Sequence, residues 1–175
     1  NFKNLVKSMN YDPAMLIWLD NDQNYFHKII TKLSTEYEAP VFLPHCTLFS
    51  PLDSDGSDCE KLLMHVANQF SPFNVRARKL KFSSNIWKTL YIELEKSSML
   101  TELQQCLISL IPDPKPYEFQ PHISLIYKEM SKMEKEQIIQ NIFVREFYKM
   151  DKISIVKTGL DIVNWKKTAE IQLYA

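Results

Sequence analysis

The first part of the chain combines a short apolar run with a segment of helical period. Residues 15–19 are apolar and end at a polar group, which predicts a buried strand. Apolar side chains then recur at helical spacing and predict a helix over residues 22–38, which Pro40 ends. These helical positions are Phe26, Ile29, Ile30, Leu33 and Tyr37. Residues 1–13 are interpreted as a lead-in segment, so the predicted single domain covers residues 14–175.

A strand, a helix and a second strand complete this half. Residues 41–49 form an apolar run that predicts another buried strand, and residues 50–56 have the composition of a loop. Ser57 and Glu60 have the spacing of a capping box at the start of a helix. Residues 73–82 alternate apolar and polar side chains, which predicts a strand with one solvent-exposed face.

The second half repeats this order. Residues 89–94 predict a strand, and leucines at helical spacing predict a helix that ends before three prolines. Residues 119–127 predict the next strand, and Ser131 with Glu134 predicts the capping box of a further helix. Final strands are expected around 153–157 and 169–174. The repeated order predicts an α+β fold built from two similar halves.

The central strand of each half carries the same motif. The first copy is Pro44-His45-Cys46-Thr47-Leu48 and the second is Pro121-His122-Ile123-Ser124-Leu125. Side chains two positions apart on a strand share a face, so each histidine is expected beside a hydroxyl. If the halves pack about a twofold axis, the two motifs face each other across a shared cleft.

A lone histidine in an apolar strand is more often a hydrogen-bonded core residue than a catalyst. Here two of the four histidines share the preceding proline, the later hydroxyl and the following leucine, which favours a functional pair. Two imidazoles near their ordinary pKa would remove a proton from an attacking oxygen and give one to a leaving oxygen of a phosphodiester. Thr47 and Ser124 would donate hydrogen bonds to the non-bridging oxygens. This chemistry needs neither a metal nor a cofactor.

The composition narrows the class of partner. The chain has 175 residues, of which 45% are hydrophobic, and 21 basic residues balance 21 acidic ones. A protein held mainly by long nucleic acid usually has a basic excess, so a small anionic ligand is favoured. The three cysteines are odd in number and widely spaced, which is typical of reduced core cysteines in a cytoplasmic protein. No apolar run reaches the length of a membrane span, and we expect a soluble monomer without a membrane partner.

These motifs resemble the 2H phosphoesterase superfamily and, within it, the cyclic phosphodiesterase family of plants and yeast. The likeness extends to the opening strand with Trp18, to Phe42-Leu43-Pro44-His45 and to residues 155–158. It covers most of residues 14–175 and is specific at the two histidine motifs. The resemblance implies a bilobal LigT-like fold, in which antiparallel sheets of two pseudo-symmetric lobes line a central cleft and helices lie outside.

The resemblance also implies a reaction and its residues. A 2′,3′-cyclic nucleotide would be opened to the 2′-phosphate, or ADP-ribose 1″,2″-cyclic phosphate to the 1″-phosphate. His45 and His122 match the catalytic pair, and Thr47 and Ser124 match the phosphate-binding hydroxyls. Tyr127 matches a tyrosine next to the active site, although strict alternation would place it opposite the histidine unless the strand ends or bulges there.

Alternative interpretations of several residues stay open. Trp18 would stack on a nucleobase or pack in the core. Basic residues between 76 and 81 would guide an anion or form the exposed face of a strand. Two other functions are a 2H enzyme acting on RNA ends or 2′,5′-oligoadenylate, and a non-catalytic RNA- or nucleotide-binding module. The first would need a longer, more basic groove, and the presence of both histidines and both hydroxyls counts against the second.

Overall fold

The computed structural model describes residues 15–21, 23–52, 56–159 and 161–175 of the chain. The predicted lead-in segment, residues 1–13, lies outside these described residues. The helices are α2 (Gln23–Glu36), α3 (Gly56–Ala67), α4 (Ser98–Ser109) and α5 (Lys132–Asn141), with the 3-10 turns η1 (Ile86–Lys88) and η2 (Ile162–Asn164). The strands are β1 (Met15–Asn21), β2 (Cys46–Leu52), β3 (Phe73–Phe82), β4 (Leu90–Leu94), β5 (His122–Ile126), β6 (Phe147–Lys157) and β7 (Lys166–Gln172).

Within the described residues these strands form one sheet in the order β2-β1-β6-β3-β4-β5, with β7 paired to β6. Every pairing is antiparallel. The equivalent strands of the two halves are β1 and β4, β2 and β5, and β3 and β6. If each strand is replaced by its equivalent, the same strand order results, read from the opposite end of the sheet. The third strand of each half therefore pairs with the first strand of the other half. This exchange confirms the prediction of two similar halves.

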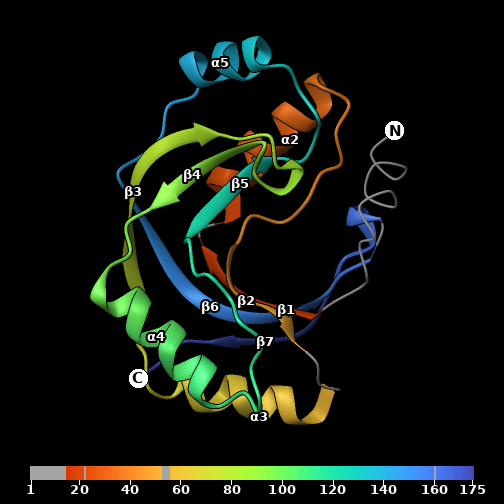
Figure 1. Cartoon of the computed structure of the whole chain (residues 1–175). Coiled ribbons are helices and arrows are strands. Elements are labelled where there is room, and N and C mark those ends of the chain that lie inside the picture. The colour runs from red at the N-terminus through yellow and green to blue at the C-terminus, as the bar shows by residue number, and fades with distance from the viewer. Residues whose placement is uncertain (1–14, 22, 53–55, 160) are drawn as a thin grey trace.

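The sheet is strongly curved, as Figure 1 shows. β2 and β5 stand at opposite ends of the strand order, and they nevertheless contact each other. β3 bridges the curve, because its first residues pair with β6 and its later residues pair with β4. The curvature thus brings the two strands of the histidine motifs side by side, although they are the most distant in hydrogen-bonding order.

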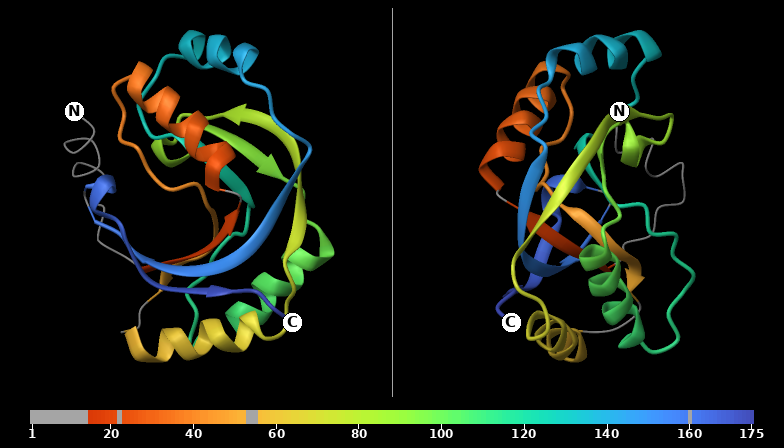
Figure 2. Two further views of the ribbon diagram at one scale, coloured as in Figure 1. Left: turned by 180° about the vertical axis from the view of Figure 1, so that it is seen from behind. Right: turned by 90° about the vertical axis from the view of Figure 1, so that its left-hand side faces the viewer.

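The helices lie outside the curved sheet (Figure 2). α2 contacts β5 and α5 contacts β3, whereas α3 packs against α4, β6 and β7. The predicted apolar faces of the helices point inward, since their central residues are 0 to 5% exposed. For α2 and α4 these buried residues are Phe26, Ile30, Leu33, Leu100, Leu103 and Leu107. None of the described helices is both long and apolar enough to cross a membrane.

The capping predictions have different outcomes. Ser131 caps α5 as predicted: its backbone N–H donates to Glu134 Oε2 at 2.8 Å, and its Oγ accepts from the backbone N–H of Glu134 at 3.2 Å. α3 begins at Gly56, one residue before the Ser57 that was expected to cap it. The helix itself is confirmed, whereas the side chain of Ser57 lies outside what the structure describes, so the capping box of α3 stays a prediction.

Both histidine strands begin later than predicted. β2 starts at Cys46, so His45 lies on the segment just before the strand, and His122 is the first residue of β5. The prolines that precede the histidines cause this shift, because proline has no N–H for a ladder and restricts the residue before it. β6, in contrast, begins at Phe147, earlier than predicted, because its first residues pair with β3.

Candidate active site

The two histidine rings are oriented by the same kind of hydrogen bond. Nδ1 of His45 lies 2.7 Å from the carbonyl oxygen of Leu43, and Nδ1 of His122 lies 2.6 Å from the carbonyl oxygen of Gln120. A carbonyl oxygen only accepts hydrogen bonds, so Nδ1 is the donor in both rings. Nε2 is therefore the nitrogen of each ring that takes up or releases a proton. The repeated sequence motif is also a repeated geometry.

The two motifs meet where β2 contacts β5. The Cys46 thiol lies fully buried at this contact, and burial raises its pKa to about 12, opposed by a hydrogen bond from the backbone N–H of His122. His122 in turn lowers the pKa of the His45 imidazole by its charge. Cys46 thus faces the core as expected, and the two imidazoles are close enough to influence each other.

Burial makes both imidazoles less basic than a histidine in water. His45 is 6% exposed, and burial lowers its pKa to about 3, with further lowering by the charges of His122 and Lys167. Burial likewise lowers the pKa of the partly exposed His122 to about 4, and the charge of Lys88 adds to this effect. The hydrogen bond at each Nδ1 opposes the shift. Both rings are therefore neutral near pH 7, so the expectation of ordinary pKa values is wrong for the protein alone.

The two hydroxyls differ in their hydrogen bonds. Thr47 is partly buried, and its hydroxyl makes no hydrogen bond within the described part of the chain. Ser124 is 3% exposed, and its Oγ donates to the carbonyl oxygen of Trp87 at 2.7 Å. Thr47 can therefore donate directly to an anion, whereas Ser124 would first have to leave Trp87. Phosphate binding by either hydroxyl stays a prediction.

Four aromatic side chains from separate segments form a cluster, and two of them contact His45. The ring centroids of Phe42 and Trp165 are 6.3 and 6.4 Å from the centroid of His45. Tyr127 stacks on Phe42 at 3.9 Å and meets Trp87 edge-on at 5.3 Å, and Trp87 lies 5.9 Å from Trp165. Tyr127 follows the last residue of β5, so the alternation of the strand no longer fixes its direction. Its ring, 3% exposed, supports the cluster, and contact with substrate stays a prediction.

The sequence patterns did not point to Trp87 or Trp165. Trp87 belongs to η1 and Trp165 follows η2, and such short turns have no periodic pattern. The available signal was residue type alone, because Trp18, Trp87 and Trp165 are the three tryptophans of the chain. The backbone of Trp18 lies in β1 as predicted and pairs with Thr47. Its side chain lies outside what the structure describes, so its proposed stacking role stays a prediction.

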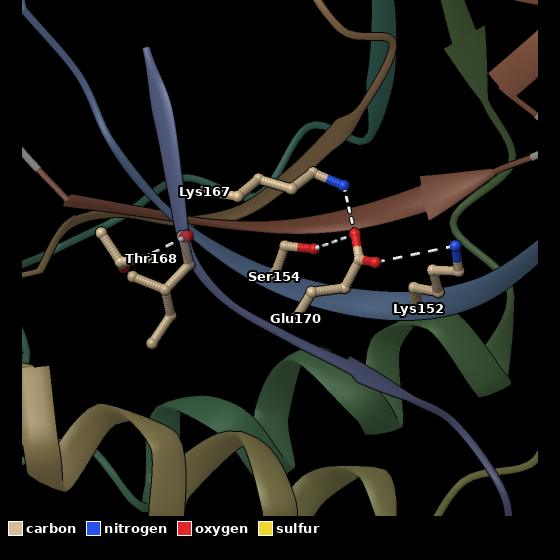
Figure 3. A network of polar contacts seen from close by, with 6 residues as sticks. Lys152, Ser154, Lys167, Thr168 and Glu170 are labelled. Carbon is tan, nitrogen blue, oxygen red and sulfur yellow. Dashed lines mark hydrogen bonds and ion pairs between the residues drawn. The ribbon is translucent and has the colours of Figure 1, made fainter.

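A network of charged side chains lies on β6 and β7 (Figure 3). Glu170 accepts a hydrogen bond from Lys167 and one from Ser154 Oγ at 3.4 Å. Lys152 Nζ lies 3.7 Å from the other carboxylate oxygen. The Glu170 carboxylate thus pairs with the ammonium groups of both Lys152 and Lys167. This pairing restrains Lys167, although 20% of its side chain is exposed.

Strand register places this network beside the first histidine motif. Thr47, Ser154 and Glu170 belong to one row of backbone partners that crosses β2, β1, β6 and β7. Residues directly opposite each other in an antiparallel sheet point to the same face. The network therefore shares the face of Thr47, which explains why Lys167 lowers the pKa of His45.

The turn η1 holds Lys88 beside the second histidine motif. Asn85 caps this turn, and its side chain accepts a hydrogen bond from the backbone N–H of Trp87 at 2.9 Å. Lys88 Nζ donates to Gln120 Oε1 at 2.8 Å, one residue from Pro121. Since Lys88 lowers the pKa of His122, each histidine has one nearby lysine. Neither Lys88 nor Lys167 was singled out from the sequence, because the fold alone brings them to the motifs.

The other sequence candidates have structural roles. Arg76 pairs with Glu146 at 2.9 Å, and Lys81 pairs with Glu93 at 2.6 Å, as expected for the exposed face of a strand. None of the three cysteines forms a disulfide. In the ranges that the structure describes, no three histidine, cysteine or acidic side chains gather in a metal-binding arrangement.

Comparison with known proteins identifies the class. A sequence profile of the 2'-5' RNA ligase superfamily matches residues 23–160, and the chain belongs to this superfamily. Predicted phosphoesterases of Bacillus mycoides strain KBAB4 and Bacillus cereus strain B4264 are 26% and 27% identical to it over 109 residues. These matches span 60% of this chain and 63% of each relative, which is less than two thirds of the relatives' length.

Solved structures confirm the predicted LigT-like α+β fold. Escherichia coli LigT in complex with 3′-AMP matches with a TM-score of 0.60 and 14% identity, over 94% of this chain and 100% of that chain. TT0787 of Thermus thermophilus matches with a TM-score of 0.61 and 15% identity, over 91% and 97%. The likeness to the plant and yeast cyclic phosphodiesterases stays a prediction.

Proposed function

We propose that this protein hydrolyses a cyclic phosphodiester in a small nucleotide, with His45 and His122 as the general base and general acid. The observation that carries the proposal is the matched pair of rings, each held by a bond from Nδ1 to a carbonyl oxygen. Superfamily membership supports the phosphoesterase class. Escherichia coli LigT has been crystallised with 3′-AMP and with phosphate, and a nucleoside monophosphate is the kind of product that the proposed reaction gives.

In the proposed reaction a neutral imidazole takes a proton from water as the water oxygen attacks phosphorus. A protonated imidazole gives its proton to the ribose oxygen that leaves, so one P–O bond forms and another breaks. The product is a phosphate monoester. Because the geometry of the two rings is matched, either histidine can take either role.

The acid must obtain its proton when the substrate binds. Both imidazoles are neutral near pH 7 in the protein alone, since their pKa values are about 3 and 4. A phosphodiester anion between the rings favours the charged form of a neighbouring imidazole and raises its pKa. Thr47 donates a hydrogen bond to a non-bridging oxygen, and Lys88 and Lys167 make the surroundings favourable for an anion.

The proposed substrates are a 2′,3′-cyclic nucleotide, opened to the 2′-phosphate, and ADP-ribose 1″,2″-cyclic phosphate, opened to the 1″-phosphate. The acid–base step uses no metal or cofactor. The name of the superfamily favours a second candidate, cleavage of a 2′,5′-linked oligonucleotide or of an RNA end by the same two imidazoles. The two candidates differ in substrate and not in the catalytic residues.

Product analysis tests this proposal. The purified protein is incubated in excess chelator with 2′,3′-cyclic AMP, ADP-ribose 1″,2″-cyclic phosphate and 2′,5′-oligoadenylate separately, and the products are compared with 2′- and 3′-phosphate standards. We expect ring opening to the 2′-phosphate or 1″-phosphate, while the oligomer stays intact. Cleavage of the oligomer alone would select the second candidate. No turnover of any of the three would contradict the proposed function.

A further inference from the structure

Lys88 holds an ammonium group beside His122. Its Nζ donates a hydrogen bond to the neutral Oε1 of Gln120 at 2.8 Å and lies 5.3 Å from the centroid of the Tyr91 ring. Within the described part of the chain it forms no ion pair, and these two contacts leave at least one of its three N–H donors for another acceptor. The His122 ring meets the same Tyr91 ring edge-on, with the centroids 5.6 Å apart. One tyrosine therefore contacts both the cation and the proposed catalytic histidine.

Two carboxylates influence this ammonium group, and neither is bonded to it. Glu93 pairs instead with Lys81 at 2.6 Å. Glu118 is exposed and accepts from Gln120 Nε2 at 2.7 Å, so an amide stands between its carboxylate and Lys88. Burial lowers the pKa of Lys88, and the charge of Lys81 adds to this effect, whereas the two carboxylates oppose it. An anion beside Lys88 would meet a cation whose charge is only partly compensated.

Strand register places Tyr91 on the face of the second histidine motif. Tyr91 is the backbone partner of Ser124 on β5. Residues directly opposite each other in an antiparallel sheet point to the same face, and His122 lies two residues from Ser124 on that face. A ligand that reaches from the His122 imidazole across Tyr91 therefore meets the ammonium group of Lys88.

The larger members of the proposed substrate class carry a second phosphate at one common position. In ADP-ribose 1″,2″-cyclic phosphate, the pyrophosphate is attached to the 5″ oxygen of the ribose that bears the cyclic phosphate. In a short RNA with a 2′,3′-cyclic end, a phosphodiester is attached to the 5′ oxygen of the corresponding ribose. Both thus have an anionic phosphate one ribose away from the reacting phosphorus, and a 2′,3′-cyclic mononucleotide does not.

We propose that Lys88 binds this second phosphate and that the enzyme prefers cyclic phosphates whose ribose carries a phosphate on its 5′ oxygen. The inference rests on the proposed function for the reaction at the histidines. An ammonium group and a phosphate oxygen form a charge-assisted hydrogen bond, which is roughly twice as strong as a neutral one. Because Gln120 and Tyr91 already hold the long side chain, less rotamer entropy is lost on binding.

A matched pair of substrates tests the assignment, namely 2′,3′-cyclic AMP and the same nucleotide with an added 5′-phosphate. We expect kcat/KM to be roughly tenfold higher for the 5′-phosphorylated compound, the effect of one charge-assisted hydrogen bond. Lys88→Met should bring this ratio close to one. Lys132→Met is the matched control and should keep the ratio, because it removes the same charge from an exposed position on α5. The ratio cancels any effect of Lys88 on His122 that both substrates share.

Two substitutions around Lys88 should move the ratio in opposite directions. Gln120→Glu replaces the neutral acceptor by a carboxylate and should lower the ratio, while the backbone carbonyl that binds His122 remains. Glu118→Gln removes an opposing carboxylate and should raise the ratio. If Lys88→Met does not fold, these two variants carry the test. A ratio of one in the unmodified protein, equal losses on both substrates in Lys88→Met, or a ratio that neither neighbouring substitution changes would overturn the assignment.

Two further substrates identify the source of the second phosphate. kcat/KM is measured for ADP-ribose 1″,2″-cyclic phosphate and for the adenosine dinucleotide that ends in a 2′,3′-cyclic phosphate. Lys88→Met should reduce turnover of at least one of them more than that of 2′,3′-cyclic AMP. The larger reduction identifies a pyrophosphate or a phosphodiester as the bound group. No extra reduction for either compound would overturn the site.

Binding separates this inference from the proposed function. If no cyclic phosphate is hydrolysed, the proposed function fails, and calorimetry with adenosine 2′,5′-bisphosphate and with 2′-AMP still tests Lys88. We expect the bisphosphate to bind roughly tenfold more tightly than 2′-AMP, with the difference lost in Lys88→Met. Equal affinity for the two ligands in the unmodified protein would overturn the second phosphate site.

Discussion

The two histidine motifs share their ring orientation and differ in what surrounds them. His45 is 6% exposed and is followed by Thr47, whose hydroxyl makes no hydrogen bond in the described part of the chain. His122 is partly exposed and is followed by Ser124, whose buried hydroxyl donates to Trp87. The two similar halves of the fold therefore hold their imidazole rings by the same kind of hydrogen bond, whereas the two hydroxyls differ in their hydrogen-bond partners. The Thr47 hydroxyl can donate to the proposed ligand, whereas Ser124 holds the turn that carries Trp87 and Lys88.

The nearby lysines differ as well. Lys167, close to His45, is paired with a carboxylate, whereas Lys88, close to His122, donates to the neutral amide of Gln120. Burial lowers the pKa of Lys88, an effect that Glu118 and Glu93 oppose. The two motifs therefore differ in how the nearby ammonium group is held, by a carboxylate at the first and by a neutral amide at the second.

Replacement of either histidine should have the largest effect. In His45→Asn and His122→Asn the amide nitrogen can keep the donation to the carbonyl oxygen of Leu43 or Gln120, while the nitrogen that transfers the proton is lost. We expect kcat/KM to fall by about 10²- to 10⁴-fold in each variant, the size of a general acid–base contribution. Circular dichroism should show that the fold is intact. Turnover near the level of the unmodified protein in either variant would contradict a mechanism in which both histidines transfer protons.

The pH dependence of kcat/KM should be displaced toward acid. In the proposed reaction only the form with one protonated imidazole is productive, and the pKa values of about 3 and 4 make this form rare at pH 7. We expect kcat/KM to rise by nearly tenfold per pH unit as the pH falls from 7 to 5. A maximum centred near pH 6.5, the pKa of an ordinary histidine, would show that burial does not lower the pKa values of the two histidines.

Folding stability should depend on pH through the same groups. The pKa of His45 is lower in the folded than in the unfolded state, so the unfolded state binds more protons below about pH 6.5. The folding stability that is linked to the lowered pKa of His45 is fully present above pH 6.5 and is lost as the pH falls toward 3. Urea unfolding should therefore show that the unmodified protein loses about 2 kcal/mol more stability between pH 7 and pH 5 than His45→Asn does. Equal losses in the two proteins would mean that His45 titrates normally when folded.

Replacement of the two hydroxyls should have the smallest effects. The Thr47 variant should lose mainly activity, and the Ser124 variant should lose mainly stability. Thr47→Val keeps the shape of the side chain and should lower kcat/KM by about tenfold, with little change in the melting temperature. Ser124→Ala leaves the carbonyl oxygen of Trp87 without its donor and should lower stability by about 1 to 2 kcal/mol. Kinetics and thermal melts of both variants check the contrast. Identical behaviour of the two variants would remove the distinction between the motifs.

The sequence predicts most of the fold because much of the pattern is local. β3 occupies residues 73–82 as its period of two predicts, and Ser131 caps α5 because the capping box is a contact within one turn. The start of β2 differs from its prediction at Pro44, where the lack of an N–H outweighs a favourable apolar run. The missing N–H of a proline therefore limits the start of a strand even where the hydrophobic pattern favours an earlier one.

The site was only partly predictable. The repeated histidine motif is visible because both copies are contiguous in sequence. Trp87, Trp165 and Lys167 are distant from the motifs along the chain and meet them only because the sheet curves until its ends touch. The low pKa values are likewise a consequence of burial, which no local pattern reports.

A double-mutant cycle tests most directly whether the two histidines act as one catalytic unit. kcat/KM is measured for the unmodified protein, His45→Asn, His122→Asn and the variant with both substitutions, on the 2′,3′-cyclic nucleotide that is hydrolysed fastest. If the imidazoles work in the same step, the second substitution should cost less than about tenfold once the first is present. Losses that multiply, each independent of the other residue, would contradict a joint acid–base reaction at one phosphorus.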